Sequence, residues 1–149
     1  PPAALRLWRG TDGVGLSAAD DPKQLERFLA ANDGLCWCAV VGGRLVGTVL
    51  CGSDGRRGYL YHVAVDEREQ GAGIGRRLVA CAVDAAREAG IGKCHAMVFA
   101  RNERGRGFWE RLGWSLRDDL VVYSHDLDAP AADASDDDRA GSAVVAGDG

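Results

Sequence analysis

The chain lacks any hydrophobic run close to the roughly 20 apolar residues that a membrane-spanning helix requires. It also lacks the Cys-x-x-Cys pair with which zinc sites commonly begin, and residues 1–10 lack the basic and then apolar pattern of a secretory signal. The cysteines are an odd number, namely Cys36, Cys38, Cys51, Cys81 and Cys94. We therefore expect a cytoplasmic protein with free thiols, no membrane contact and no bound metal.

A broad positive charge is absent as well. The 149 residues include 18 Lys plus Arg against 22 Asp plus Glu, a net charge of -4. Residues 128–149 hold six Asp and one Arg, a net of -5, which leaves +1 for residues 1–127. Duplex binding requires a basic surface, so nucleic acid is not an expected partner. The acidic stretch has no aromatic residue and little to bury, which predicts one folded domain over 1–127 and a disordered tail over 128–149.

The first half of the chain predicts strands around one helix. Alternation of apolar and charged residues over 5–8 favours a short strand, and Asp-Asp-Pro at 20–22 favours the start of a helix that ends near residue 33. Two apolar runs joined by Gly42-Gly43 indicate a β-hairpin. A further strand is expected over 59–65.

The second half alternates helices and strands. Apolar residues at spacings of three and four predict a helix over 74–89 that Gly90 ends. A short strand is expected over 95–99, then a helix that Asn102 caps, and a last strand over 120–127. The pattern indicates an α/β (α+β) protein with an antiparallel front half and a βαβ back half.

The segment from Gln70 to Arg76 carries the strongest functional signal. It places three glycines within five residues where an apolar strand, 63–65, gives way to a long helix. Glycine in a helix costs about 1 kcal/mol relative to alanine, so this spacing needs a reason. Without side chains the backbone N–H groups can approach a phosphate closely, and the helix dipole favours an anion there. A flexible glycine turn without a ligand is the alternative interpretation.

Two common phosphate motifs do not fit this segment. A Walker loop needs Gly-Lys followed by Ser or Thr, and a dinucleotide fingerprint needs a glycine where Arg76 stands. The Gln-Gly-Ala-Gly-Ile-Gly run after the Val-Ala-Val strand end instead resembles the pyrophosphate-binding motif of the GNAT acetyltransferase superfamily. Residues 102–114, from Asn102 to the Gly-Trp pair, resemble the second signature of the same family. The two motifs occur in the family's order.

The resemblance covers roughly residues 5–127 and is closest in size to a small single-domain bacterial branch. It implies the GNAT fold, a central mixed and mostly antiparallel sheet of six to seven strands, with the fourth and fifth splayed apart and three to four flanking helices. It also implies acetyl-CoA as co-substrate, with its pantetheine arm along 63–65 and its pyrophosphate on the amides of 71–76. The candidate cofactor-binding residues are Val63, Ala64, Val65, Gln70, Gly71, Ala72, Gly73, Ile74, Gly75, Arg76, Asn102 and Arg111.

Two of these candidate residues can be interpreted in a second way that involves no cofactor. Asn102 corresponds to a family residue that contacts the pantetheine side, and it also suits a helix N-cap. Arg111 stands where a basic residue often reaches the nucleotide phosphate, and it is equally an ordinary solvated helix charge. The residues alone do not decide between these roles.

The resemblance implies that a primary amine of a small molecule or peptide attacks the thioester directly in a ternary complex. An alkylamine with a pKa of about 10.4 is almost fully protonated at pH 7, so a proton acceptor or a desolvated pocket must help. Family members often use a strand carboxylate for this, but 59–65 and 95–99 contain none. The polar side chains left near the cleft are Tyr59, Tyr61, His62 and His95. The open alternatives for the proton acceptor are His62 or a chain of ordered waters.

The leaving thiolate raises a second question. Trp109 stands where the family usually has the tyrosine proposed to protonate it, and an indole N–H is not a useful acid at neutral pH. A thiol of pKa about 8.5 leaves well as the bare thiolate, so the loss is tolerable. Tyr123 on the expected last strand is a substitute donor, and Trp109 is alternatively a core residue.

The missing carboxylate and Trp109 admit a second functional class. In that interpretation the chain is a non-catalytic acyl-CoA-binding sensor or interaction module on a GNAT fold. The sequence identifies neither the acceptor amine nor the oligomeric state, and a homodimer is left open.

Overall fold

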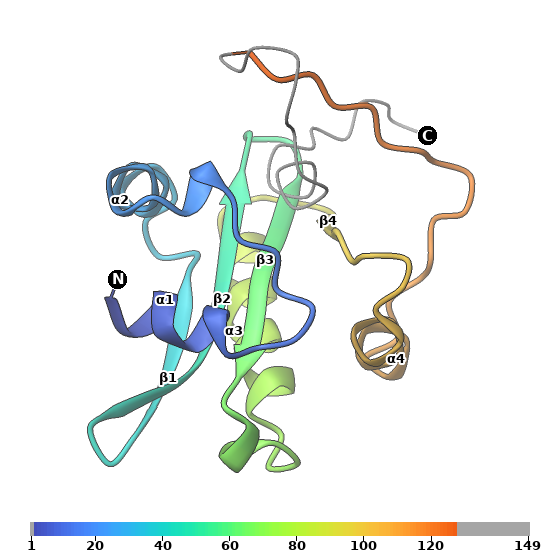
Figure 1. The fold of residues 1–149 in the computed structure, drawn as a ribbon. Coiled ribbons are helices and arrows are strands. Elements are labelled where there is room, and N and C mark those ends of the chain that lie inside the picture. The colour runs from blue at the N-terminus through green and yellow to red at the C-terminus, as the bar shows by residue number, and fades with distance from the viewer. Residues whose placement is uncertain (1, 128–149) are drawn as a thin grey trace.

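The computed structural model describes residues 2–127, so the expected acidic tail lies outside the described part. One sheet has the strand order β1-β2-β3-β4, with helices on both faces (Figure 1). The strands are β1 (Trp37–Val41), β2 (Arg44–Ser53), β3 (Gly58–Val65) and β4 (Cys94–Ala96). The helices are α1 (Pro2–Arg9), α2 (Pro22–Ala31), α3 (Ile74–Glu88) and α4 (Glu103–Arg111), with short 3-10 helices η1 (Ala18–Asp20) and η2 (Glu67–Glu69).

The sheet is mixed and mostly antiparallel, as predicted. β1 and β2 form the predicted hairpin, in which Gly42 and Gly43 have φ of 55° and 76°. β2 pairs with β3 antiparallel, and β3 pairs with β4 parallel. The chain passes from β3 through α3 to β4, and these three elements form the predicted βαβ unit.

The core has two layers, one on each face of the sheet. On the α3 face, Val49 and Cys51 of β2 and Leu60 of β3 pack against the apolar side of α3. On the other face, Leu50 and Ala64 pack under α1 and α2 (Figure 1). Full burial of such side chains stabilises the fold by about 1.5–3 kcal/mol each, so both helical layers hold β3 in place.

The helices that carry local start and stop signals lie where the sequence predicts them. The Asp21 side chain caps α2, with Pro22 in its first turn. Asn102 caps α4. Gly90, with φ 88°, follows the end of α3. These signals act within a few residues, which is why the sequence locates them.

The predicted strand at residues 5–8 is wrong, because these residues belong to α1. Ala4, Leu5, Leu7 and Trp8 all pack in the same core layer, and Trp8 is 1% exposed. These four residues recur at spacings of three and four, which matches the helical period. The alternation at 5–7 matches the strand period equally well, so the segment fits both. Burial of Trp8 between α2 and the sheet favours the helix.

The predicted last strand, 120–127, is also wrong, because no strand is assigned there. Val121 and Tyr123 are 77% and 87% exposed. A β-branched run becomes a strand only when a neighbour accepts its backbone hydrogen bonds, and residues 2–127 offer it none. β4 is likewise shorter than the expected 95–99. Residues 2–127 therefore contain a four-stranded sheet, and the expected six to seven strands are not confirmed.

Candidate active site

An open cleft of about 2010 Å³ follows β3 and β4 and is bordered by α4 and by the loop between α1 and η1. The parallel pairing runs only from Gly58–Cys94 to Leu60–Ala96, although β3 continues to Val65. The two strands therefore diverge, as the resemblance implies for the splayed pair. A site for one small ligand has about 300–1,000 Å³, so this cleft has room for two substrates together.

The end of β3 forms one edge of the cleft. Val63, Ala64 and Val65 line it, and beyond Leu60 no strand of residues 2–127 pairs with β3 on the β4 side. Such a strand edge can bind an extended ligand through main-chain hydrogen bonds. The predicted pantetheine-binding residues thus lie at an edge that can receive it.

The loop from β3 to α3 leaves the start of α3 open. Gly71 and Gly73 have φ of 87° and 80°, in the left-handed region that favours glycine. A Cβ at either position would have nothing within 4 Å, and no side chain caps the helix at Gly73. The first N–H groups of α3, at residues 74–76, therefore have the free donors and the positive dipole end that bind anions.

The third glycine of the motif has a different role. A Cβ at Gly75 would lie 3.2 Å from Cε2 of Phe108, so the missing side chain lets α4 pack closely on α3. The sequence predicts a phosphate-binding role for all three glycines. Close helix packing accounts for the third without a ligand.

The exposed Gln70 side chain braces the loop. Its Nε2 donates a hydrogen bond to the Val65 carbonyl at 3.1 Å, and Arg104 Nη2 donates to its Oε1 at 2.8 Å. On the other side of the turn, Arg44 Nη1 pairs with Asp66 at 2.8 Å. The Gln70 side chain thus connects the end of β3 to α4.

Asn102 caps α4 and is enclosed by glycines. Its Oδ1 accepts a hydrogen bond from the Gly105 N–H at 2.9 Å, as the N-cap interpretation predicts. A Cβ at either Gly13 or Gly105 would overlap the Asn102 amide. The glycine inside α4, which lowers helix propensity, therefore makes room for the cap, and Gly13 brings the loop after α1 over it.

Of the two candidate proton donors for the leaving thiolate, Trp109 lies at the cleft and Tyr123 does not. Trp109 lines the cleft, but its ring packs against Trp114 at 4.5 Å and Phe108 at 5.2 Å between centroids. The prediction that Tyr123 reaches the site is wrong, because Tyr123 lies in the exposed segment without a strand and does not line the cleft. Arg76 and Arg111 both line the cleft.

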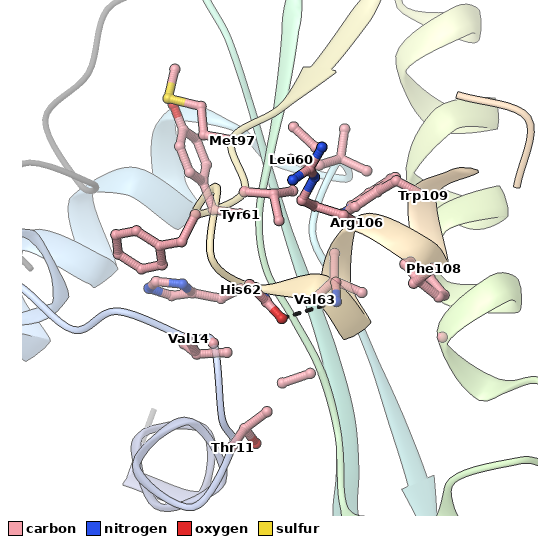
Figure 2. A pocket seen from close by; sticks show the side chains of 18 of the residues that line it. Thr11, Val14, Leu60, Tyr61, His62, Val63, Met97, Arg106, Phe108 and Trp109 are labelled. Atoms are coloured by element: carbon pink, nitrogen blue, oxygen red, sulfur yellow. Dashed lines mark hydrogen bonds between the residues drawn. The ribbon is translucent and has the colours of Figure 1, made fainter. Parts of the chain in front are cut away.

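His62 lies in a β-bulge of β3. Thr48 pairs with Ala64 but Leu50 pairs with Tyr61, so β3 has one extra residue there. His62 has φ 48° and is the one non-glycine residue with positive φ in residues 2–127. Strict alternation would turn its side chain toward α3. The bulge instead turns it to the same side as Tyr61 (Figure 2).

A buried hydrogen-bond chain supports this bulge. Trp8 Nε1–H donates to Thr48 Oγ1 at 2.8 Å, and the Thr48 hydroxyl donates to the His62 carbonyl at 2.9 Å. The Trp8 and His62 rings lie 4.5 Å apart. Three elements, α1, β2 and β3, thus hold one residue in a backbone conformation that costs free energy.

Asp20 is the carboxylate that the sequence analysis missed. His62 Nε2 lies 2.6 Å from Asp20 Oδ1, and the Ser17 N–H donates to Asp20 Oδ2 at 2.9 Å. Burial alone raises the pKa of Asp20, but the hydrogen bonds from His62 and Ser17 and the charge of His62 outweigh it and hold that pKa below its ordinary value. The Ser17-x-x-Asp20 capping pattern could have located Asp20 but not its partner.

Tyr61 lies near His62 on the same side of β3 (Figure 2). Burial is the largest cause that raises the pKa of Tyr61, so it is a neutral phenol near pH 7. Its ring meets Phe28 edge-to-face, with the centroids 6.3 Å apart. Tyr61 thus forms an aromatic part of the wall.

No group of three or more His, Cys, Asp or Glu side chains in residues 2–127 is arranged to hold a metal ion. No helix of that part is both long and apolar enough to cross a membrane.

Comparison with known proteins connects this geometry to a family. The sequence matches the Acetyltransferase (GNAT) family over residues 3–114. An acetyltransferase of Pectobacterium atrosepticum is 32% identical over 121 residues, which cover 80% of this chain and 84% of that protein. An acetyltransferase of Sodalis glossinidius is 29% identical over 124 residues, which cover 83% and 86%.

Solved structures with the same fold have been determined with coenzyme A or its analogues. One is N-acetylglutamate synthase from Neisseria gonorrhoeae, complexed with coenzyme A and N-acetyl-glutamate, with a TM-score of 0.60 and 25% sequence identity. The match covers 74% of this chain and 25% of that larger chain. AAC(6')-Iy, bound to the bisubstrate analogue CoA-S-monomethyl-acetylneamine, has a TM-score of 0.63 and 18% identity, covering 83% of this chain and 92% of that one.

Proposed function

Because the chain belongs to the GNAT acetyltransferase family and is thus an acyltransferase, we propose that it transfers an acetyl group from acetyl-CoA to a primary amine of a small molecule or peptide. The amine attacks the thioester directly while both substrates are bound. The observation that carries this proposal is the uncapped start of α3, behind the left-handed Gly71 and Gly73 and beside the free edge of β3.

The cofactor residues divide into three groups. The N–H groups of 71–76 hold the pyrophosphate, with the charge of Arg76 beside them. The main chain of 63–65 hydrogen-bonds the pantetheine arm along the strand edge. Arg111 adds charge for the nucleotide phosphate, and Asn102 and Gln70 shape the site by holding α4 and the loop. The coenzyme A that is bound to N-acetylglutamate synthase supports coenzyme A as the ligand.

The chemistry that acetyl-CoA supplies is an activated acyl group on a thiol that leaves readily. The chain must hold the amine against that carbonyl and accept a proton from it. His62 is the proton acceptor of this proposal, and Tyr61 forms the wall beside it. Trp109 is a packing residue, and the thiolate leaves without a protein acid because its pKa of about 8.5 makes it a good leaving group.

The acceptor is proposed as a class only. N-acetyl-glutamate and an acetylneamine derivative are bound to the two similar proteins, and both are acetylated small-molecule amines. The cleft is large enough for an amine of that size next to coenzyme A. These points support a small-molecule amine, with a peptide N-terminus as the other candidate.

Thiol release tests the proposal. Acetyl-CoA is mixed with the protein and a panel of polyamines, amino acids, aminoglycosides and peptides, and free thiol is followed with time. We expect release that depends on one group of amines and an acetylated amine of matching amount. Binding of coenzyme A without release above background for every amine would overturn the enzymatic proposal and leave the sensor interpretation.

A further inference from the structure

We propose that His62 and Asp20 form a proton-accepting pair, in which His62 Nδ1 takes a proton from the amine substrate and Asp20 is the positioning residue that holds the ring. This inference rests on the proposed function and deepens it. It assigns the accepting atom and adds a residue from η1, a 3-10 helix that neither family motif includes.

The short contact sets the tautomer of the ring. Asp20 is an ionised carboxylate, since its pKa is held below the ordinary value, and it can only accept hydrogen bonds. His62 Nε2, 2.6 Å from Asp20 Oδ1, must therefore carry the proton that it donates. In the neutral imidazole the other nitrogen, Nδ1, then has a lone pair that can accept a proton.

The Nδ1 atom is accessible from the cleft. Within residues 2–127 it makes no hydrogen bond, and no side-chain nitrogen or oxygen of that part is both buried and without a partner. Nδ1 must therefore reach solvent, and both His62 and Asp20 line the cleft. Figure 2 shows the His62 ring between Tyr61 and Val14, on the α1 and α2 side of β3.

The pair is held rigidly. Trp8 packs on the ring, Thr48 holds the bulge, and the Ser17 N–H fixes the second oxygen of Asp20. A strained backbone maintained by several elements is common at functional sites. A ring that only filled core space would not need a left-handed φ or an accessible nitrogen.

The groups packed against the His62 ring differ in charge. Asp20 from η1 is the charged group that faces it, while Trp8 from α1 and Thr48 from β2 are neutral and Tyr61 is the titratable neighbour on β3. No Lys or Arg of residues 2–127 forms an ion pair with Asp20. Asp20 can therefore stabilise the imidazolium that forms during the reaction.

The proton and electron balance of the step is complete. His62 Nδ1 takes one proton from the substrate ammonium, and the freed lone pair attacks the thioester carbonyl carbon. The C–N bond forms and the C–S bond breaks with its electron pair on sulfur. The second amine proton ends on that sulfur, so the products are an amide, a free thiol and a protonated His62.

The first experiment removes the base without straining the backbone. In His62→Gly, glycine adopts φ 48° freely and leaves a ring-sized gap. We expect the turnover with acetyl-CoA and the best amine of the panel to fall about 10²–10⁴-fold. Added imidazole should restore part of the lost turnover. Thiol release in a matched reaction that contains imidazole but no amine is subtracted first. Full activity, or a loss that imidazole does not change at any concentration, would overturn the inference.

The second experiment compares two adjacent carboxylates. Asp20→Asn should lower kcat by at least about tenfold, leave the KM for acetyl-CoA unchanged and move the acid limb of the pH–rate profile to lower pH. Asp21→Asn, which removes the charge of the exposed α2 cap but keeps an oxygen that can accept from the Lys23 N–H, should change neither. Equal effects of the two variants, or an unmoved acid limb in Asp20→Asn, would mean that Asp20 does not act through His62.

A spectroscopic readout separates this inference from the proposed function. The ¹⁵N spectrum of the three histidine rings, with His62 assigned by its loss in His62→Gly, should show the Nε2–H tautomer near neutral pH. An Nδ1–H tautomer would overturn the pair even in an active enzyme. No thiol release from the wild type with any amine would overturn the proposed function and the proton transfer together.

Discussion

The two sides of the cleft are assembled in different ways. The glycine-loop wall, residues 63–76, comes from one continuous stretch that ends a strand, turns and starts α3. The His62 wall consists of Asp20 of η1 and His62 of β3, which line the cleft, with Trp8 of α1 and Thr48 of β2 packed behind them. A contiguous site can be recognised as a motif, whereas a dispersed one exists only when the chain has folded.

The same difference separates the proposed cofactor binding from the proposed chemistry. The glycine-loop wall contributes main-chain donors, so it depends on the course of the backbone. The His62 wall depends on particular side chains at hydrogen-bond distance. Damage to the first wall should therefore remove coenzyme A affinity, and damage to the second should remove turnover with affinity intact.

The largest expected effect is at the glycine-loop wall. Gly73→Glu introduces a side chain and a negative charge where the pyrophosphate is proposed to lie, so we expect at least about a hundredfold weaker binding of coenzyme A by calorimetry. Gly55→Glu is the matched control, because Gly55 has φ 87°, equally open surroundings and no place in the cleft. Unchanged affinity in Gly73→Glu would remove the cofactor placement.

The next largest effect is expected from a change that affects the His62 wall alone. Thr48→Val leaves the Trp8 N–H and the His62 carbonyl without their buried partner, which costs about 1–3 kcal/mol in the free energy of unfolding. We expect lower turnover with unchanged affinity for coenzyme A. Thr48→Ser keeps the hydroxyl and should keep the turnover, despite the loss of a methyl group worth about 0.8 kcal/mol. Weaker coenzyme A binding in Thr48→Val would show that the walls are coupled.

Trp109→Tyr tests whether a third group takes part in the chemistry. The ring packs between Phe108 and Trp114, so the smaller side chain should lower the free energy of unfolding by about 1 kcal/mol. Turnover should be unchanged or raised, since a phenol is a better acid than an indole. A loss of roughly a hundredfold in turnover would instead place Trp109 in the acceptor wall.

The smallest expected effect is the acid dependence of stability. The pKa of Asp20 is lower in the folded than in the unfolded chain, so its contribution is present above the unfolded value, about 3.9, and is lost as pH falls through the folded value. Chemical unfolding should show Asp20→Asn less stable than the wild type at neutral pH, with the difference shrinking below about pH 4. A difference that is independent of pH would mean that the carboxylate charge does not contribute.

Local signals explain which elements the sequence predicted. The Asp21-Pro22 start, the Gly42-Gly43 hairpin turn and the Asn102 cap each act through neighbouring backbone groups, and all three are confirmed. Residues 5–8 and 120–127 are short apolar segments that fit more than one period. Their state depends on distant partners: the sheet and α2 bury Trp8, and nothing in residues 2–127 pairs with 120–127.

The candidate site divides in the same way. The sequence by itself determined the glycine loop, because left-handed turns and a free helix start depend on residues next to each other. Only the tertiary structure decided the environment of His62. One extra residue in β3 reverses the direction of its side chain, and Asp20 is 42 positions away along the chain. Hydrogen bonds and charges act through space, so no pattern of neighbouring residues could specify that pair.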